Sequence, residues 1–473
     1  MIPFIGRKRE LNLLSQLLEK RTSSMVVIKG RRRIGKTRLI KEFGKSFKTY
    51  SFTGLPPSDG ISLLAQKEEF ARQLQQQLQV PSPKADDWGT LFWHLGHHTQ
   101  SGKLLIVLDE INWMGSKDPT FLGKLKTAWD DHFKNNPQLI LILCGSISSW
   151  IEENILKSTG FFGRISMTLN LEELSLAECN LFWQNQKDLV SAYDKFKTLS
   201  VLGGIPKYLE EINPDLTAEE NIRRLCFQTE GLLFREFDSI FSDLFSKKNT
   251  VYKAIVRRLA EGKAELEDIF ESLGVQKNGV IGHYLDDLIQ AGFVSRDFTW
   301  NIQNGKESKF SHYRLRDNYL RFYLKYIEPN KRKIARGGFT LPSAWETSLG
   351  LQFENLVLNN RNTLQNILKI DPQEIESDNP YFQRKTSKQD GCQIDYLIQT
   401  KQDLYVCEIK FTAGPVKLSV LDELEQKIKR LHAPTHFSFR PVLIHVNGVH
   451  KKVIESQFFS RIIDFSDLFL APK

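Results

Sequence analysis

Cysteine is scarce in this chain: only five occur among 473 residues, and no two of them form a C-x-x-C pair. An odd number of cysteines without that spacing favours reduced thiols over a disulfide framework. Several of the five stand inside apolar stretches with the composition of buried strands. We therefore expect core thiols in a cytoplasmic protein.

Long apolar stretches are also missing. Because no run of about 18 apolar residues occurs, the sequence predicts no transmembrane helix and no membrane partner. Residues 1–11 lack the apolar segment of a secretory signal peptide. Low-complexity segments and internal repeats are absent as well. What remains is ordinary globular sequence, 41% hydrophobic and 26% charged, long enough for about three or four domains.

Residues 25–43, MVVIKGRRRIGKTRLIKEF, contain every fixed position of the pattern G-x-x-x-x-G-K-[ST]. An apolar run precedes the pattern and apolar residues recur at helical spacing after it. Strand, loop and helix therefore follow in the order that a phosphate-binding loop requires. Gly30 and Gly35 allow backbone N–H groups to point at an anion. Lys36 can reach the β- and γ-phosphates of a nucleotide, and Thr37 can ligate Mg²⁺.

A second polar pair follows a buried strand. Residues 104–110 read LLIVLDE, so two carboxylates stand at the carboxyl end of an apolar run. Ligands of parallel α/β sheets bind at that end of the strands. In a nucleotide hydrolase, Asp109 would hold Mg²⁺ through water and Glu110 would orient the attacking water. Asn112 and Trp113 come next and are candidates for lining the same pocket.

Two further residues near the predicted nucleotide site have two interpretations each. Ser146 follows the buried strand at residues 139–145 and suits either a sensor of the γ-phosphate or an N-cap for the next helix. Arg164 suits either charge stabilisation of phosphoryl transfer, in cis or from a neighbouring subunit, or a structural salt bridge. Arg235 is a second candidate for reaching a neighbour's nucleotide.

The middle of the chain predicts helices and then a hairpin. Residues 171–245 read as a helical lid, interrupted by the turn GGIP at 203–206. Residues 250–315 give three helices, a strand, a glycine turn and a strand, which is the order of a winged helix-turn-helix. The third helix carries Lys277, Asn278 and His283 but also two aspartates, so it suits protein packing as well as DNA. The net charge of +9 permits nucleic-acid contact without requiring it.

Near the C-terminus, residues 393–399 (QIDYLIQ) and 404–411 (LYVCEIKF) predict two strands with a tight turn between them. If the turn has two residues, residues whose numbers sum to 803 face each other, and Asp395 lies opposite Glu408 with Cβ atoms about 5 Å apart. Two such carboxylates repel unless a cation lies between them. Lys410 shares a face with Glu408, and Glu354 on the preceding helix could complete the site. Mg²⁺ on Asp395 and Glu408 beside Lys410 is the apparatus of phosphodiester hydrolysis; a solvated, charged hairpin face is the alternative.

Four stretches together resemble a known family: FIGRKREL, GRRRIGKT, LLIVLDE and GGIPKYL. They are similar to the AAA-like prokaryotic P-loop ATPases common in archaea and bacteria, which are related to the STAND signalling ATPases. The tail, with its D…ExK pattern, resembles the PD-(D/E)xK nuclease fold of Holliday-junction resolvases and restriction enzymes. The resemblance covers nearly the whole chain, although the proline of that motif is not evident before Asp395.

The resemblance implies a set of site residues. ATP would bind at Arg7, which would lie by the adenine, and at Gly30, Arg33, Ile34, Gly35, Lys36, Thr37 and Arg38. Mg²⁺ would be supported by Thr37 and Asp109, and Glu110 would be the hydrolytic base. The nuclease positions would be Glu354, Asp395, Glu408 and Lys410. Arg31, Arg32 and Arg33 need not touch phosphate, because the cradle is made of backbone.

We expect an α/β multidomain protein with four parts: a P-loop parallel-sheet ATPase core (1–170), a helical lid (171–245), a winged helix-turn-helix (246–335) and a restriction-endonuclease-like domain (336–473). Its cofactors would be ATP and Mg²⁺. The expected function is ATP hydrolysis that controls a metal-dependent nuclease or a nuclease-derived DNA-binding domain. The alternative is an ATP-dependent signalling switch that assembles with itself or with a protein partner, its nuclease-like domain being inactive.

Overall fold

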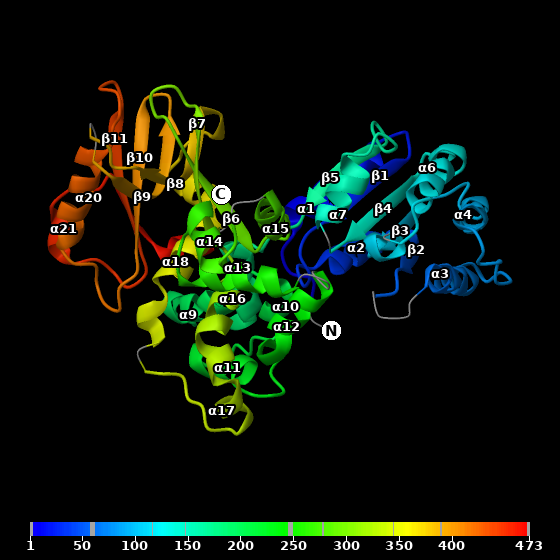
Figure 1. The fold of residues 1–473 in the computed structure, drawn as a ribbon, viewed down its shortest axis with the longest axis horizontal. Coiled ribbons are helices and arrows are strands. Elements are labelled where there is room, and N and C mark those ends of the chain that lie inside the picture. The colour runs from blue at the N-terminus through cyan, green and yellow to red at the C-terminus, as the bar shows by residue number, and fades with distance from the viewer. Residues whose placement is uncertain are drawn as a thin grey trace. The chain divides into compact units, whose positions relative to one another are not determined.

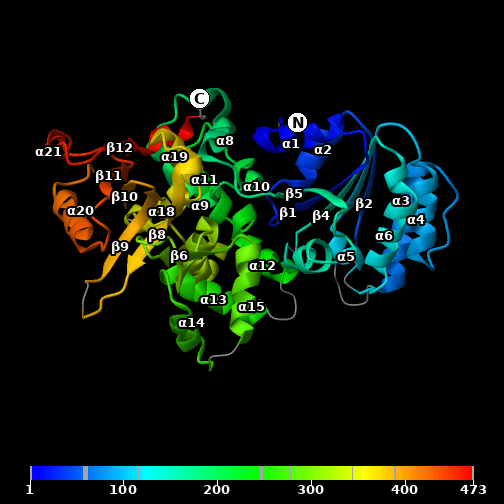
Figure 2. The same ribbon diagram turned by 90° about the horizontal axis from the view of Figure 1, so that it is seen from above.

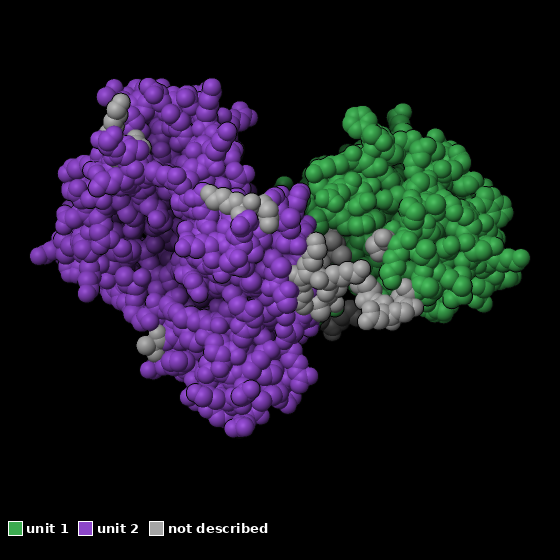
Figure 3. All heavy atoms as spheres, in the orientation of Figure 1, with its two compact units in different colours: residues 1–172, 290–292 green, residues 173–289, 293–473 purple. Residues whose placement is uncertain are grey.

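A computed structural model describes residues 3–56, 62–115, 117–146, 148–244, 249–276, 279–343, 345–387 and 390–470. The chain forms two compact units, residues 1–172 with 290–292 and residues 173–289 with 293–473 (Figure 3). Across the described residues, no helix is both long and apolar enough to cross a membrane. All five cysteines are free and buried.

Unit 1 is built on a five-stranded sheet in the order β2-β3-β4-β1-β5 (Figures 1 and 2). The strands are β1 (Ser24–Lys29), β2 (Lys48–Thr53), β3 (Leu104–Asp109), β4 (Leu139–Gly145) and β5 (Ile165–Asn170). Every neighbouring pair is parallel, which confirms the predicted parallel sheet. Because the strands are parallel, the carboxyl ends of β1, β3 and β4 meet at one edge, where ligands of such sheets bind.

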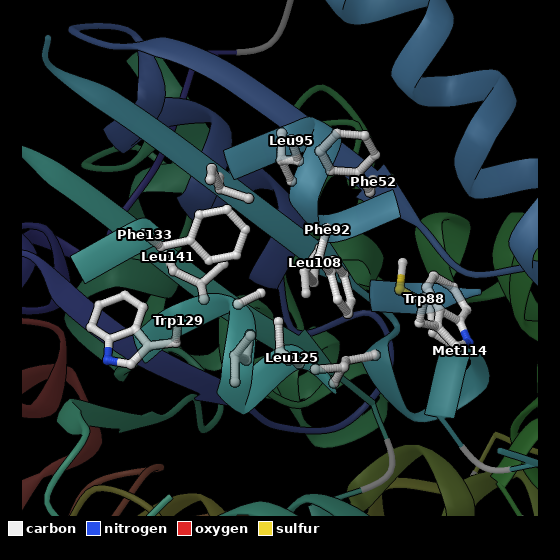
Figure 4. Packing of buried hydrophobic residues seen from close by; sticks show 14 of the residues in the cluster. Phe52, Trp88, Phe92, Leu95, Leu108, Met114, Leu125, Trp129, Phe133 and Leu141 are labelled. Carbon is white, nitrogen blue, oxygen red and sulfur yellow. The ribbon is translucent and has the colours of Figure 1, made fainter. Parts of the chain in front are cut away.

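Helices complete unit 1: α1 (Lys8–Gln16), α2 (Lys36–Gly44), α3 (Leu63–Leu78), α4 (Trp88–His97), α5 (Ile111–Gly115), α6 (Phe121–Asp131) and α7 (Ser148–Ile151). Helix α4 begins where it does because the Asp87 carboxylate accepts hydrogen bonds from the N–H groups of Gly89 and Thr90. Its apolar face buries Trp88 and Phe92, whose rings stack with centroids 5.6 Å apart, in the core under the sheet (Figure 4).

Unit 2 begins with helices α8 (Leu176–Asn180), α9 (Ala192–Leu202), α10 (Pro206–Leu209), α11 (Ala218–Cys226) and α12 (Leu232–Leu244). Then follow α13 (Asn249–Glu261), α14 (Leu266–Leu273), α15 (Gly279–Gln290) and the antiparallel hairpin β6 (Val294–Trp300) and β7 (Glu307–Leu315). The predicted sequence of three helices and a hairpin is therefore present, while its assignment as a winged helix-turn-helix remains a prediction. Lys277 and Asn278 lie outside the described residues, and His283 and Asp286 are exposed on α15.

The C-terminal part of unit 2 contains a mixed sheet in the order β12-β11-β10-β9-β8. Its strands are β8 (Ile375–Gln383), β9 (Cys392–Thr400), β10 (Asp403–Lys410), β11 (Ser438–His445) and β12 (Arg461–Asp464). The remaining helices of unit 2 are α16 (Asn318–Phe322), α17 (Lys331–Ala335), α18 (Gly350–Leu358), α19 (Arg361–Ile367), α20 (Ser419–Arg430) and α21 (Lys451–Glu455). Strands β8, β9 and β10 are antiparallel neighbours, whereas α20 connects β10 to the parallel strand β11.

The β6–β7 hairpin packs on this sheet. Trp300 is buried with Ile394 and Leu397 in one core, and its indole N–H donates to the Gln399 side chain at 2.5 Å. Asn379 of β8 donates to the Phe298 carbonyl at 3.1 Å. The hairpin and the C-terminal sheet thus share a core.

One buried ion pair joins the same elements. Arg314 of β7 donates to Asp297 of β6 through Nε at 2.8 Å and Nη2 at 3.3 Å, and through Nη1 to Asn355 of α18. The side chains of Arg314 and Asp297 are 3% and 0% exposed. Burial in an apolar surrounding is tolerable for these charges only because each satisfies the other.

Arg314→Met should lower the free energy of unfolding by about 3 kcal/mol, because it leaves the Asp297 carboxylate buried without its cation. Chemical denaturation of parent and variant measures the difference. Arg296→Met is the matched control: Arg296 is exposed on the same hairpin, and its loss should change stability by under about 0.5 kcal/mol. Equal effects of the two changes would contradict the importance of the buried pair.

Candidate functional site

The loop between β1 and α2 has the backbone of an anion cradle. Gly30 adopts φ +149°, and a Cβ atom there would lie 2.5 Å from the Leu171 carbonyl oxygen. Gly35, with φ +91°, forms the N-cap of α2. Only glycine tolerates both positions easily, so the sequence pattern and the loop geometry have the same cause.

Lys36 closes the loop on itself. Its ammonium group donates to the carbonyls of Gly30 at 2.7 Å and Arg31 at 3.0 Å, and the residue is 6% exposed. An ammonium group held against the cradle by neutral carbonyls can turn toward a phosphate oxygen, which is a stronger, charged acceptor. Arg33 adopts φ +71° within the same loop.

The hydroxyl of Thr37 donates to Asp109 Oδ2 at 2.9 Å. This contact joins the first turn of α2 to the end of β3. The other carboxylate oxygen of Asp109 accepts the N–H of Glu110 at 3.0 Å. A hydroxyl and a carboxylate in contact beside an anion cradle are the oxygen ligands that Mg²⁺ takes when it also holds phosphates and water. The residues therefore fit the expected metal.

Glu110 is held in a specific position. Its backbone has φ +50°, and its Oε2 accepts hydrogen bonds from Ser146 N at 3.1 Å and Ser146 Oγ at 2.8 Å. Ser146, directly after β4, thus contacts the predicted base itself. The sequence placed both residues near the nucleotide but did not reveal this bond, since the two strands that carry them are far apart in the chain.

The other predicted nucleotide-site residues contact the protein. Arg7 Nη2 donates to the carbonyls of Ile34 at 3.1 Å and Glu172 at 2.5 Å. These two hydrogen bonds connect the phosphate loop, through Ile34, to Glu172. Arg38 Nη2 donates to the Pro3 carbonyl at 3.1 Å. Asn112 is buried against Gly145, where an added Cβ would lie 2.4 Å from its side-chain oxygen.

Arg164 forms a two-pronged ion pair with Asp130, at 3.0 Å from Nε and 2.8 Å from Nη2. Hydrogen bonds from Arg164 and Lys126 hold the pKa of Asp130 well below its usual range. Of the two interpretations of Arg164, this geometry matches the structural salt bridge. Arg235 is exposed on α12.

The C-terminal hairpin has the predicted register. Leu404 pairs with Gln399 and Cys407 with Tyr396, so the numbers of facing residues sum to 803. This confirms the two-residue turn and places Asp395 and Glu408 at the next position. The Asp395 carboxylate accepts the N–H of Ile409 at 2.9 Å.

Lysines surround the carboxylates of this hairpin. Glu408, 3% exposed, contacts Lys427 of α20 at 2.6 Å and Lys410 at 3.7 Å. Lys410 also contacts Glu423 at 2.6 Å. Glu354 contacts Lys263 at 2.5 Å. Lys263 and Lys427 were not expected from the sequence, and only the fold brings them to the acids.

Burial raises the pKa of the Asp395 carboxyl, and the nearby Glu408 charge raises it further. Burial likewise raises the pKa of Glu354, against the lowering effect of Lys263. Such perturbed carboxyl groups are typical of functional sites, although buried ion-pair networks produce them too. The sequence could have indicated the repulsion between the acids but not its partial relief by lysines.

The acidic residues of the C-terminal site, Glu354, Asp395 and Glu408, do not form a complete set of metal ligands. In the part of the chain that the structure describes, no three His, Cys, Asp or Glu side chains are grouped so that they could hold a metal ion. Asp395 and Glu408 could still supply two ligands, because Mg²⁺ commonly keeps several waters. Glu354 lines a cavity of about 310 Å³, whereas Lys410 lines a different cavity of about 560 Å³.

Comparison with known proteins addresses the first of these two sites. Residues 4–212 match the family model of an ATPase domain found predominantly in Archaea. Over these residues the chain is similar to an archaeal-type ATPase domain. The family match therefore supports ATP binding and ATPase function for the site around Lys36, whereas it ends before the C-terminal carboxylates.

Two individual relatives and one solved structure are also similar to this chain. An uncharacterised protein of Methanocaldococcus jannaschii is 27% identical over 358 residues, 75% of this chain and 76% of the relative. An uncharacterised ATP-binding protein of the same organism is 40% identical over 43 residues, 9% of this chain and 73% of the relative. Among solved structures, a Walker-type ATPase of Pyrococcus abyssi has a TM-score of 0.52 at 16% identity, covering 68% of this chain and 96% of that one. This last likeness shows a shared fold.

Asp395→Asn should raise the midpoint of thermal unfolding at neutral pH and lose this effect in acid. The pKa of Asp395 is higher in the folded protein than in the unfolded chain. The protonated carboxyl group therefore contributes stability below the unfolded pKa, and this stability is lost as pH rises through the folded pKa. Asparagine does not ionise, so at neutral pH the variant avoids the cost of a buried carboxylate charge. Asp390→Asn, an exposed site just before β9, serves as control. If Asp395→Asn instead destabilises the protein at neutral pH, Lys427 more than compensates the carboxylate charge.

Proposed function

We propose that the site around Lys36 hydrolyses ATP by in-line attack of water on the γ-phosphate. The contact between Thr37 and Asp109, beside Lys36 and Glu110, carries this proposal. Lys36 would exchange its two carbonyl acceptors for the β- and γ-phosphates. Thr37 and Asp109 would hold Mg²⁺, which neutralises charge on the phosphates when it is bound.

Glu110 would orient the attacking water and accept its proton. In the structure its Oε2 accepts both hydrogen bonds from Ser146. An ionised carboxylate has a second oxygen with its own lone pairs, so Oε1 would accept the hydrogen bond from the water. Ser146 would thereby hold the carboxylate in a fixed orientation.

Glu110→Gln should retain ATP binding but lower the hydrolysis rate by about a hundredfold or more, because the amide cannot accept the proton of the water. Lys36→Ala should lose turnover as well, through weaker phosphate contact. Phosphate release and nucleotide-binding titrations separate the two effects. Lys41→Ala, exposed on the same helix, should leave both unchanged. Parent-like turnover by the Lys36 variant would refute this assignment of the active site.

For the C-terminal part of unit 2, we propose action on DNA under control of the nucleotide state. The domain would be a metal-dependent nuclease or a nuclease-derived DNA-binding module. Support comes from the register of β9 and β10, which sets Asp395 opposite Glu408 when it is extended by one position, and from the contact of Lys410 with Glu408. Asp395 and Glu408 would ligate Mg²⁺, and Lys410 would assist the attacking water. The predicted winged helix-turn-helix and the net charge of +9 agree with a DNA partner.

Asp395→Ala should abolish Mg²⁺-dependent DNA cleavage, since it removes one of the two carboxylates that would ligate the metal. Gel assays with single-stranded, duplex and branched DNA, in Mg²⁺ or Mn²⁺, make the measurement. Asp422→Ala, exposed on α20, is the matched control and should cleave like the parent. If the parent cleaves none of these substrates, the nuclease proposal fails and the DNA-binding form remains.

A second candidate function is a STAND-like signalling switch that assembles with itself or with a protein partner. The ion pairs of Lys427 with Glu408 and of Lys263 with Glu354 favour it. These lysines already compensate the carboxylate charge that a metal ion would otherwise compensate. A lysine-compensated cluster can stabilise a fold without catalysis. In that case the nucleotide would control assembly, and light scattering would show a change of mass between ATP and ADP.

A further inference from the structure

A second feature of unit 2 lies outside both candidate active sites. A cavity of about 540 Å³ is lined by residues of the β6–β7 hairpin, strand β8 and the segment after α20. Its volume is within the range of about 300–1,000 Å³ of pockets that hold small organic groups. Four aromatic side chains line it: Trp300, Phe310, Tyr381 and Phe382. We call it the aromatic cavity.

A stack of flat groups forms one wall. The ring of Phe310 meets that of Phe382 edge to face, with centroids 4.9 Å apart. The guanidinium carbon of Arg384 lies 3.7 Å from the centroid of Phe310, and the Arg384 side chain is 60% exposed. Aromatic rings and stacked guanidinium planes are the surfaces on which unpaired bases stack.

Exposed basic residues are neighbours in sequence of the residues that line the aromatic cavity, and we call them its basic rim. Exposed Lys306 lies in the hairpin turn, Lys385 follows Arg384, and Arg430 stands two residues before the lining residue His432. Acidic groups here include Glu307, which is exposed on β7, and Glu265, which pairs with Arg384. The excess of cations suits a polyanionic backbone.

The aromatic cavity adjoins a cavity that one of the candidate nuclease residues, Glu354, lines. It shares Tyr381 and Phe382 with the cavity of about 310 Å³ that Lys263 and Glu354 line. Strand β8 carries both shared residues and runs beside β9, which carries Asp395 (Figures 1 and 2). A chain molecule with a base in the aromatic cavity would therefore extend toward Glu354.

We infer that the aromatic cavity binds an unpaired base of single-stranded DNA, with the flanking phosphates on its basic rim. This inference rests on the proposed action on DNA and specifies the form of the substrate. Stacking on Phe310 and Arg384 requires a free base face, which a base inside a duplex lacks. Single-stranded DNA should consequently bind more tightly than a duplex of the same length.

The test is fluorescence anisotropy with a labelled oligothymidylate and a length-matched duplex, using the full chain without ATP and with EDTA in place of metal. Phe310→Ala should weaken single-strand binding by about tenfold, since one base loses its stacking partner. Phe310→Leu, which keeps the apolar volume and guards against misfolding, should weaken it similarly. Phe310→Trp should restore it. Phe162→Ala, at a site 85% exposed in unit 1, should bind like the parent.

Each outcome separates this inference from the proposed function. Single-strand binding that the Phe310 variants leave unchanged overturns the aromatic cavity while action on DNA stands. A parent protein that binds the duplex more tightly than the single strand also overturns the inference, while action on DNA stands. A parent that binds neither DNA overturns both the inference and the proposed action on DNA.

Discussion

One buried guanidinium group determines how unit 2 is put together. Arg314 donates hydrogen bonds to Asp297 within the hairpin and to Asn355 on α18. Separating the hairpin from α18 would therefore break the bond to Asn355 and expose the buried guanidinium group. Asn355 adjoins Glu354, and Lys263 is tied to the hairpin because Ala264 bridges to Tyr313. The ion pair between Lys263 and Glu354 is therefore a consequence of this anchoring. Residues from two predicted domains consequently build one charged cluster.

The parts that sequence predicts well are those whose geometry is local. The phosphate loop needs only Gly30, Gly35 and the flanking strand and helix, all within one short stretch, and the parallel sheet follows from buried apolar strands. The register of Asp395 follows from a two-residue turn, which leaves only one pairing. For the phosphate loop and the hairpin, the determining contacts lie close together in the chain.

The parts that sequence does not predict depend on tertiary contacts. Nothing in the local pattern around Lys263 or Lys427 distinguishes them from solvated lysines, and both meet their carboxylates only after distant elements pack. The same holds for Ser146 and Glu110, which lie at the ends of two adjacent strands. Such polar pairs form where the fold buries them, because burying an unpaired charge costs more free energy than burying a paired one.

The two functional interpretations of the C-terminal cluster therefore differ in one physical quantity, the free energy of exchanging a lysine for a divalent cation. Glu408 has an ammonium group at 2.6 Å, so a metal must either displace Lys427 or share the carboxylate with it. Asp395, whose pKa is raised by burial and by Glu408, gains most from added positive charge. A DNA phosphate that arrives together with the cation would supply it with further oxygen ligands. The bound DNA would also exclude water, which strengthens the attraction between the cation and both carboxylates. Metal occupancy and substrate binding would then be coupled, and the lysines would hold the acids in place in the interval between substrates.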